Sequence, residues 1–229
     1  MSHLDRVAFT VAVLVGTSAA WAGFIFDTQT RQVEGRVWAG VGSTYSDTIT
    51  APNFGLFDAT THVTDPTYGG SANQHQRSQL LPNLITVIGD TTCYRPGNAG
   101  AGQAYARSSF DVNFTVTQPT LVSLEASGSL TGSAATNSRA IGLIGPNADI
   151  RWGNGYSPGL FPEVSGTNST TVTLAPGSWR FLVSLASSDD RFTGYSAVNN
   201  FDVRLRELPE PGFLAPALVA LLPLIRRKK

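Results

Sequence analysis

The segment Ser109–Thr117 reads SFDVNFTVT, in which apolar and polar residues alternate without a break. Successive side chains of a β-strand point to opposite faces of the sheet, so the apolar side chains would share one face and the polar ones the other. We therefore expect a half-buried strand, with its apolar face on the core and its polar face in water. The apolar positions are Phe110, Val112, Phe114 and Val116.

Other strands are predicted on both sides of this segment, wherever apolar residues alternate or form a short β-branched run. We expect Pro176-Gly177 to form a type II turn that joins two alternating segments into a hairpin, with Trp179 facing inward on the second. Residues 58–82 contain Pro66 and a polar run, show no usable period, and are predicted to be a long loop. The predicted strands lie around residues 33–41, 54–57, 84–88, 122–130, 139–145, 170–175, 179–185 and 201–205.

These segments predict an all-β domain at residues 23–206, an antiparallel β-sandwich of jelly-roll or other Greek-key topology. The charged fraction of 14% and the many Gly, Ser, Thr and Asn residues suit short strands joined by turns. The 16 basic residues balance the 16 acidic ones, which argues against a nucleic-acid partner. Cys93 is the single cysteine, so no disulfide within the chain can stabilise the fold.

Residues 1–22 have the organisation of a secretory signal peptide, and we expect this segment to form a signal helix. A short start that carries Arg6 precedes a mainly apolar run from Val7 to Ala20. Ala20 and Ala22 supply the small residues that a signal peptidase recognises, so cleavage would follow Ala22. A buried N-terminal helix is the alternative interpretation of the same run.

Residues 207–229 consist of three different pieces. Pro209, Glu210 and Pro211 form a segment that cannot lie inside a helix. The uncharged run that follows, residues 212–225, is roughly 14 residues long and would cover about 21 Å as a helix. Since a comfortable span needs ~20 residues, this short transmembrane helix would require local thinning of the bilayer. Four cations end the chain and would stay on the cytoplasmic side. They are Arg226, Arg227, Lys228 and Lys229.

This tail resembles the PEP-CTERM sorting signal of Gram-negative bacteria, which has a Pro-Glu-Pro box, a short transmembrane run and a basic end. The resemblance implies processing by an exosortase, a membrane-embedded enzyme, and delivery to the cell surface or an extracellular polymer. Pro216 and Pro223 interrupt the run, and the basic end mixes lysine with arginine. Residues 208–212 are also similar to the sortase motif Leu-Pro-x-Thr-Gly, but proline replaces the threonine at which that enzyme acts. The predicted strands before the box resemble the β-sandwich ectodomains of PEP-CTERM proteins.

No catalytic pattern stands out in residues 23–206. There is no Gly-x-Ser-x-Gly elbow and no His-Glu-x-x-His pair. Cys93 and His75 could form a nucleophile and its base, but nothing nearby in sequence would orient the imidazole. We therefore expect no catalytic residue, metal or cofactor. A metal cluster could be drawn from Asp58, His62, Asp65 and His75, although their spacing is not that of ligands.

A binding site is the next hypothesis. Trp152, Asn154 and Tyr156 fall in a predicted loop, where aromatic rings and an amide could bind a glycan. The alternative interpretation is that the two aromatic residues close the end of the sandwich. Asp189 and Asp190 could offer oxygens to calcium, but a solvated turn is the default.

The sequence thus predicts an exported, non-enzymatic surface or extracellular-matrix protein that passes through an exosortase-type pathway. Its expected partners are signal peptidase, an exosortase and the inner membrane, which would anchor the protein in transit. A polysaccharide-binding module that acts through the Trp152–Tyr156 loop is the alternative function. A secreted hydrolase is a third class, and it would need two carboxylates that converge in a cleft.

Overall fold

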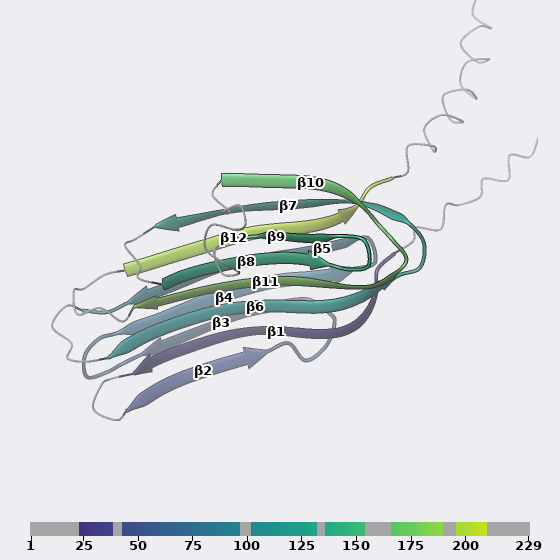
Figure 1. Cartoon of the computed structure of the whole chain (residues 1–229). Coiled ribbons are helices and arrows are strands. Elements are labelled where there is room, and N and C mark those ends of the chain that lie inside the picture. Colours follow the sequence, from purple (N-terminus) through teal and green to yellow (C-terminus); the bar gives the residue numbers. More distant parts are fainter. Residues whose placement is uncertain are drawn as a thin grey trace, which may run out of the picture.

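The computed structural model describes residues 23–38, 43–96, 102–131, 136–153, 166–189 and 196–209. Within these ranges the chain forms twelve β-strands and no helix (Figure 1). No helix in the described part is long and apolar enough to span a bilayer. The predicted signal helix and transmembrane helix lie outside the described residues, together with Ala20, Ala22 and everything after Pro209.

The strands vary from four to fourteen residues in length. They are β1 (Ile25–Trp38), β2 (Thr44–Thr50), β3 (Phe57–Thr64), β4 (Ser71–Leu81), β5 (Leu84–Tyr94), β6 (Gln103–Val116), β7 (Thr120–Thr131), β8 (Thr136–Ile144), β9 (Asp149–Trp152), β10 (Gly166–Leu174), β11 (Gly177–Asp189) and β12 (Ser196–Glu207).

Two six-stranded antiparallel sheets face each other (Figure 1). The first has the order β2-β1-β6-β11-β8-β9 and the second the order β10-β7-β12-β5-β4-β3. When the second order is read in reverse, strands at the same place in the two sheets contact one another, such as β1 with β4, β6 with β5, and β11 with β12. The prediction of an all-β, antiparallel fold is therefore confirmed. The last two strands are inserted between earlier ones, β11 between β6 and β8, and β12 between β5 and β7.

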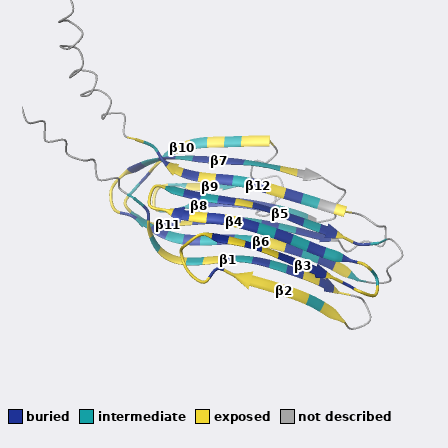
Figure 2. Ribbon diagram, turned by 180° about the vertical axis from the view of Figure 1, so that it is seen from behind, coloured by how far each residue is buried: buried dark blue, intermediate teal, exposed yellow. Residues whose placement is uncertain are grey.

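The alternating segment that begins at Ser109 is part of β6, in the middle of the first sheet. Its apolar side chains are at most 1% exposed and pack in the main core. Trp179, predicted to face inward, is also 1% exposed, and its indole Nε1 donates to the carbonyl of Ala175 at 2.9 Å. Figure 2 shows the same alternation of buried and exposed positions along most strands, whereas the edge strand β2 is largely exposed.

The prediction of a loop at residues 58–82 is wrong, because β3 and β4 occupy most of this range. Burial alternates strictly along both strands. Three successive buried positions of β4 are polar, so its hydropathy shows no period, whereas β3 does bury Phe57, Ala59 and Val63 in alternation. Gln74, Gln76 and Ser78 point inward and are at most 1% exposed. Opposite them, Arg31 of β1 is fully buried and donates to the carbonyl and hydroxyl oxygens of Ser78 at 3.3 and 3.2 Å. The interior at this side of the fold therefore contains a polar layer, next to two small apolar clusters.

The prediction of a hairpin at Pro176-Gly177 is also wrong. β10 belongs to the second sheet and β11 to the first, so the turn carries the chain between the sheets. Gly177 has φ 133°, a value that favours glycine. Leu174 and Trp179 on either side of the turn are both buried, because each strand faces the same core from its own sheet. An alternating pattern on both sides of a turn does not distinguish the two arrangements.

The remaining differences concern strand boundaries. The strand expected at residues 33–41 begins eight residues earlier, as β1 starts at Ile25. The polar stretch after it forms β2, whose residues pair with β1 despite their low hydropathy. Of the strand expected at residues 54–57, only Phe57 belongs to a strand, and residues 51–56 connect β2 to β3 across the edge of the fold.

The two ends of the sandwich differ in what they carry. β1 starts and β12 ends at the same end, which lies at the right in Figure 1, and we call it the terminal end. There the amide of Phe24 donates to Pro82 O at 2.5 Å and the amide of Leu208 to Leu121 O at 2.8 Å. The opposite end, which we call the loop end, carries the connection at residues 65–70 and the C-terminal end of β5.

Candidate functional site

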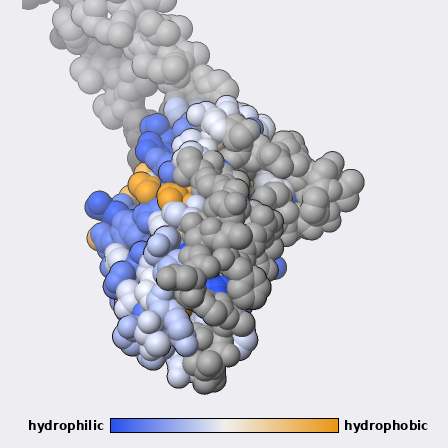
Figure 3. All heavy atoms as spheres, turned by 90° about the vertical axis from the view of Figure 1, so that its left-hand side faces the viewer, coloured by the Kyte–Doolittle hydropathy of each residue, from blue (hydrophilic) through white to orange (hydrophobic). Residues whose placement is uncertain are grey.

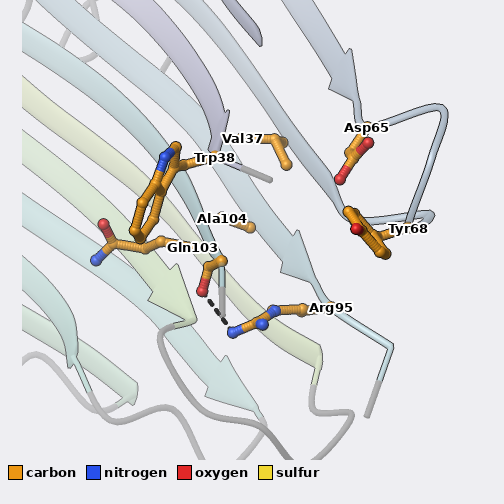
Figure 4. Close-up of a pocket in the computed structure, with 9 residues that line it drawn as sticks. Val37, Trp38, Asp65, Tyr68, Arg95, Gln103 and Ala104 are labelled. Carbon is orange, nitrogen blue, oxygen red and sulfur yellow. Dashed lines mark hydrogen bonds between the residues drawn. The ribbon is translucent and has the colours of Figure 1, made fainter. Parts of the chain in front are cut away.

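A small pocket opens at the loop end (Figure 4). It lies between the last residues of β1, the β3–β4 connection, the residue after β5 and the start of β6. Its volume of about 10 Å³ has room for a single water molecule. The lining residues are Val37, Trp38, Asp65, Tyr68, Gly70, Arg95, Gly102, Gln103 and Ala104.

Asp65 fixes the floor of this pocket by organising the β3–β4 connection. Its backbone amide donates to Gly70 O at 2.8 Å and its carbonyl accepts from the amide of Gly69 at 2.9 Å. Its carboxylate Oδ1 accepts the amide of Thr67 at 2.8 Å. Gly69 has φ 74°, which an L-residue rarely adopts, so the tight turn depends on glycine here. As a result Asp65 is only 3% exposed, although it lies in a connection.

Arg95 forms the other part of the floor. It is 3% exposed and its Nη1 donates to the carbonyl of Gly102 (Figure 4). This bond joins the end of β5 to the residue before β6. Asp65 and Arg95 thus place a negative and a positive side chain in the floor. Toward a polar ligand, the carboxylate would accept hydrogen bonds and the guanidinium would donate them.

Aromatic side chains form the walls of the pocket. Trp38 is 43% exposed and lies beside Gln103, while Tyr68 lies next to Asp65 on the other side (Figure 4). Flat rings with nearby amide and carboxylate groups suit the faces and hydroxyls of a sugar unit. The volume excludes insertion of a whole ring, so a glycan would rest on the rim and place one hydroxyl in the pocket. The chemistry of these groups is that of a site for a neutral polar ligand.

Figure 3 looks at the loop end, where the described atoms in view are mainly hydrophilic apart from a small hydrophobic area. Trp38 is one of several large apolar side chains exposed in the described part of the chain, together with Ile49, Phe54 and others, so its exposure alone does not mark a site.

Trp152, the described member of the predicted glycan-binding loop, packs against the main core and is half-buried. It ends the edge strand β9, and Gly153 follows with φ 111°. A Cβ at Gly153 would lie 2.7 Å from the carbonyl carbon of Arg139, so the chain passes β8 closely at this point. Asn154 and Tyr156 lie outside the described residues, and a glycan site that includes them stays a prediction.

Of the four residues considered as a metal cluster, the structure brings Asp58 and His75 into contact. His75 Nε2 lies 2.9 Å from Asp58 Oδ1 and its Nδ1 lies 3.5 Å from Asp90 Oδ1, on the outer face of the second sheet. His62 bonds Asn73 on the same face, and Asp65 belongs to the pocket. Among the described residues no group of three or more His, Cys, Asp or Glu residues could hold a metal ion. Asp189 and Asp190 are beyond the described side chains.

Cys93 and His75 cannot act as a nucleophile and its base, because they lie on opposite faces of the second sheet. Cys93 points inward and is fully buried, with its Sγ 3.0 Å from Ser187 O. His75 points outward, between Asp58 and Asp90.

Two carboxylates meet in one groove, on the outer face of β7, β10 and β12. Glu125 and Asp202 line this open groove of about 160 Å³ together with Arg204. Arg204 binds Asp202 at two points, with Nε 3.1 Å from Oδ1 and Nη2 2.8 Å from Oδ2. The hydrogen bond and charge of Asp202 raise the pKa of Arg204 above its ordinary value. Asp202 thus accepts hydrogen bonds from arginine. A glycoside hydrolase needs one carboxylic acid that donates a proton, and Asp202 in this ion pair is not suited to that role.

No known protein family matches the chain, and no curated protein matches it either. The sequence interpretation had placed an aromatic site in the predicted loop at Trp152–Tyr156 and had not singled out Trp38 or Tyr68. Tyr68 could have been noticed, because it lies between Pro66 and Gly69, two residues that favour a turn. Trp38 gave no such signal, because it falls inside the strand predicted at residues 33–41.

Proposed function

We propose that the chain is an exported, non-enzymatic protein of the cell surface or extracellular matrix, sorted by its C-terminal signal through a PEP-CTERM or exosortase-type pathway. The observation that carries the proposal is the position of the box relative to the fold. β12 ends at Glu207, the amide of Leu208 makes a last bond to the sheet, and Pro209 directly after it is exposed. A processing enzyme could therefore reach the box without unfolding the body.

In this scheme signal peptidase removes residues 1–22 and the two-sheet body, a Greek-key-like ectodomain, folds after export. The run at residues 212–225 holds the protein at the inner membrane, with the four terminal cations in the cytoplasm. An exosortase-type enzyme then recognises Pro209, Glu210 and Pro211 and releases the body toward the surface.

The test is the intact mass and the cell fraction of the exported protein. We expect a loss of roughly 2 kDa from each end, because both targeting segments are removed. Replacing Pro209, Glu210 and Pro211 together with alanine should leave the protein in the membrane fraction with its C-terminus intact. Asp47→Ala, an exposed change on β2, is the matched control and should be processed normally. Normal release of the triple variant would refute the role of the box.

Polysaccharide binding is the second candidate function, and the Trp38–Tyr68 pocket is the observation that favours it. The pocket lies at the loop end, opposite Pro209. β6 has 14 residues, so the two ends are separated by about 45 Å. A body anchored through its terminal end would point this pocket away from the membrane and toward extracellular polymer.

Binding can be measured by co-sedimentation of the protein with extracellular polysaccharides. Trp38→Ala and Tyr68→Ala should each weaken binding about fivefold or more, because each removes a stacking surface. Ile49→Ala, an exposed apolar change on β2, is the control. If the variant Trp152→Ala alone loses binding, the site lies in the loop after β9 instead, and if none of the variants matters this function is excluded.

A further inference from the structure

The two open sheets have four edge strands, and three of them are protected in ways that natural proteins commonly use. β2 carries Asp47, and β3 carries Asp58 next to the ion-paired His75. β9 has only four residues and includes Asp149 and Arg151, which pair at 2.6 Å. Charges and short length both prevent a foreign strand from pairing with an edge.

β10 is the exception. It forms the outer edge of the second sheet and lies uppermost in Figure 1. Its nine residues, Gly166–Leu174, read GTNSTTVTL and include no charged residue and no proline. β-Branched residues dominate its second half, and such residues favour strand pairing. This edge is therefore suited to accept another strand.

The backbone of β10 shows which groups are available. Asn147 Nδ2 donates to Thr173 O at 2.9 Å, and Asn147 Oδ1 accepts the amide of Ala175 at 3.0 Å. The carbonyl of Thr173 therefore points away from β7. Because the direction alternates along a strand, the N–H and C=O groups of Thr167, Ser169 and Thr171 point to the same outer edge. Asn147 caps only the C-terminal end of that edge.

We propose that β10 pairs with β10 of a second copy of this chain, antiparallel and around a two-fold axis at Ser169. Ser169 then lies opposite Ser169 of the other copy, and Thr167 lies opposite Thr171 in two equivalent places. The side chains of all three residues are exposed on one face, so the pairing matches hydroxyl with hydroxyl and brings no like charges together. This register leaves the Asn147 cap intact.

A second copy fits this edge better than a charged partner, because the strand has no charge with which to select one. A two-fold axis makes the interface self-complementary, as in most homodimers. The product is a continuous sheet of two second sheets joined edge to edge. The proposal concerns the described body alone and does not depend on how the tail is processed.

The experiment uses disulfide trapping in the full-length chain, kept in detergent. In the variant Ser169→Cys the paired Cα atoms would be about 5.5 Å apart, within reach of a disulfide. We expect a covalent dimer on a non-reducing gel after mild oxidation. Thr48→Cys, an exposed position on edge strand β2, is the matched control and should remain monomeric. The native Cys93 is buried and does not interfere.

Charge pairs then test the register. Added to Ser169→Cys, the pair Thr167→Lys and Thr171→Lys places lysine opposite lysine twice and should reduce the dimer. The pair Thr167→Glu and Thr171→Lys places glutamate opposite lysine twice and should restore it. Together the two pairs should differ in association constant on the order of tenfold.

Three outcomes would overturn the proposal. The first is a dimer yield of Ser169→Cys no higher than that of Thr48→Cys. The second is equal yields from the lysine–lysine and glutamate–lysine variants, since only antiparallel pairing at this register distinguishes them. The third is failure of the thiol introduced by Ser169→Cys to react with a hydrophilic maleimide in monomeric protein, because the edge would then be covered by the chain itself.

Discussion

Gly145 lies against the ring of Trp179, and this contact decides how the β8–β9 turn packs on the core. A Cβ added at Gly145 would be 2.6 Å from Trp179 Cε2 and closer still to two other atoms of the indole. Ordinary carbon–carbon contact begins near 3.5 Å, so the ring would have to retreat by ~1 Å. Trp179 is 1% exposed and its indole N–H is hydrogen-bonded to Ala175 O. The ring therefore cannot shift without breaking this hydrogen bond.

We therefore expect Gly145→Ala to lower the free energy of unfolding by about 3 kcal/mol, the upper part of the range for overpacked cores. The assay is urea unfolding followed by far-UV circular dichroism. Gly70→Ala is the matched control, because its added Cβ would meet Val37 at 3.3 Å, where a slight shift is enough, and it should cost less than about 1 kcal/mol.

A double-mutant cycle separates the clash from other effects. Trp179→Phe alone should cost about 2 kcal/mol, since it removes buried volume and the indole hydrogen bond. Combined with Gly145→Ala, the smaller ring relieves the clash, so the two costs should fall short of additivity by at least ~1 kcal/mol. If Gly145→Ala is as stable as the wild type, or if the two changes are additive, the packing argument is wrong.

Arg31→Ala should lower the free energy of unfolding by about 3–4 kcal/mol in the same assay, because it leaves a cavity and removes the donor to Ser78 and Gln29. Arg36→Ala, on the exposed face of β1, is the control and should cost under ~0.5 kcal/mol. An equal loss for both arginines would contradict the role of the polar layer. Burial raises the pKa of Tyr105, so the unfolded chain loses its phenolic proton first and stability should fall as the pH rises above 10. Tyr105→Phe should make this fall above pH 10 shallower, and identical slopes would refute it. Cys93 should not react with a thiol reagent until urea unfolds the protein, and then one thiol per chain should appear; rapid labelling of the native protein would show that its buried position is wrong.

Strict alternation of apolar residues was sufficient to predict β6 and the inward face that contains Trp179. Such segments carry the period of a strand in their hydropathy, because one of their faces lies on an apolar core. The all-β class and the antiparallel arrangement followed from several segments of this kind. The low charged fraction and the many Gly, Ser, Thr and Asn residues supported the same conclusion.

β4 could not be predicted from hydropathy, since three of its successive inward positions are Gln74, Gln76 and Ser78. β3 alternates apolar and polar residues at Phe57, Ala59 and Val63, and this short signal was overlooked. A buried polar layer has the geometry of a strand but not its hydropathy. The pocket escaped prediction for a different reason. It unites Trp38 at the end of β1, Asp65 after β3 and Arg95 after β5. Their proximity depends on the order of the strands, which periodicity does not encode.

The position of β12 has a consequence for how the molecule is made. It is the last strand of the chain, yet it lies between β5 and β7 and pairs with both. Until it arrives, the second sheet consists of two separate parts, with β3, β4 and β5 on one side and β7 and β10 on the other. A chain that emerges from its N-terminus cannot complete this sheet until Glu207 has emerged, so the second sheet closes only once all of β12 is available. The second sheet then closes at about the time when Pro209 emerges. A nascent chain that stops before β12 would leave a gap between β5 and β7 and expose the core there.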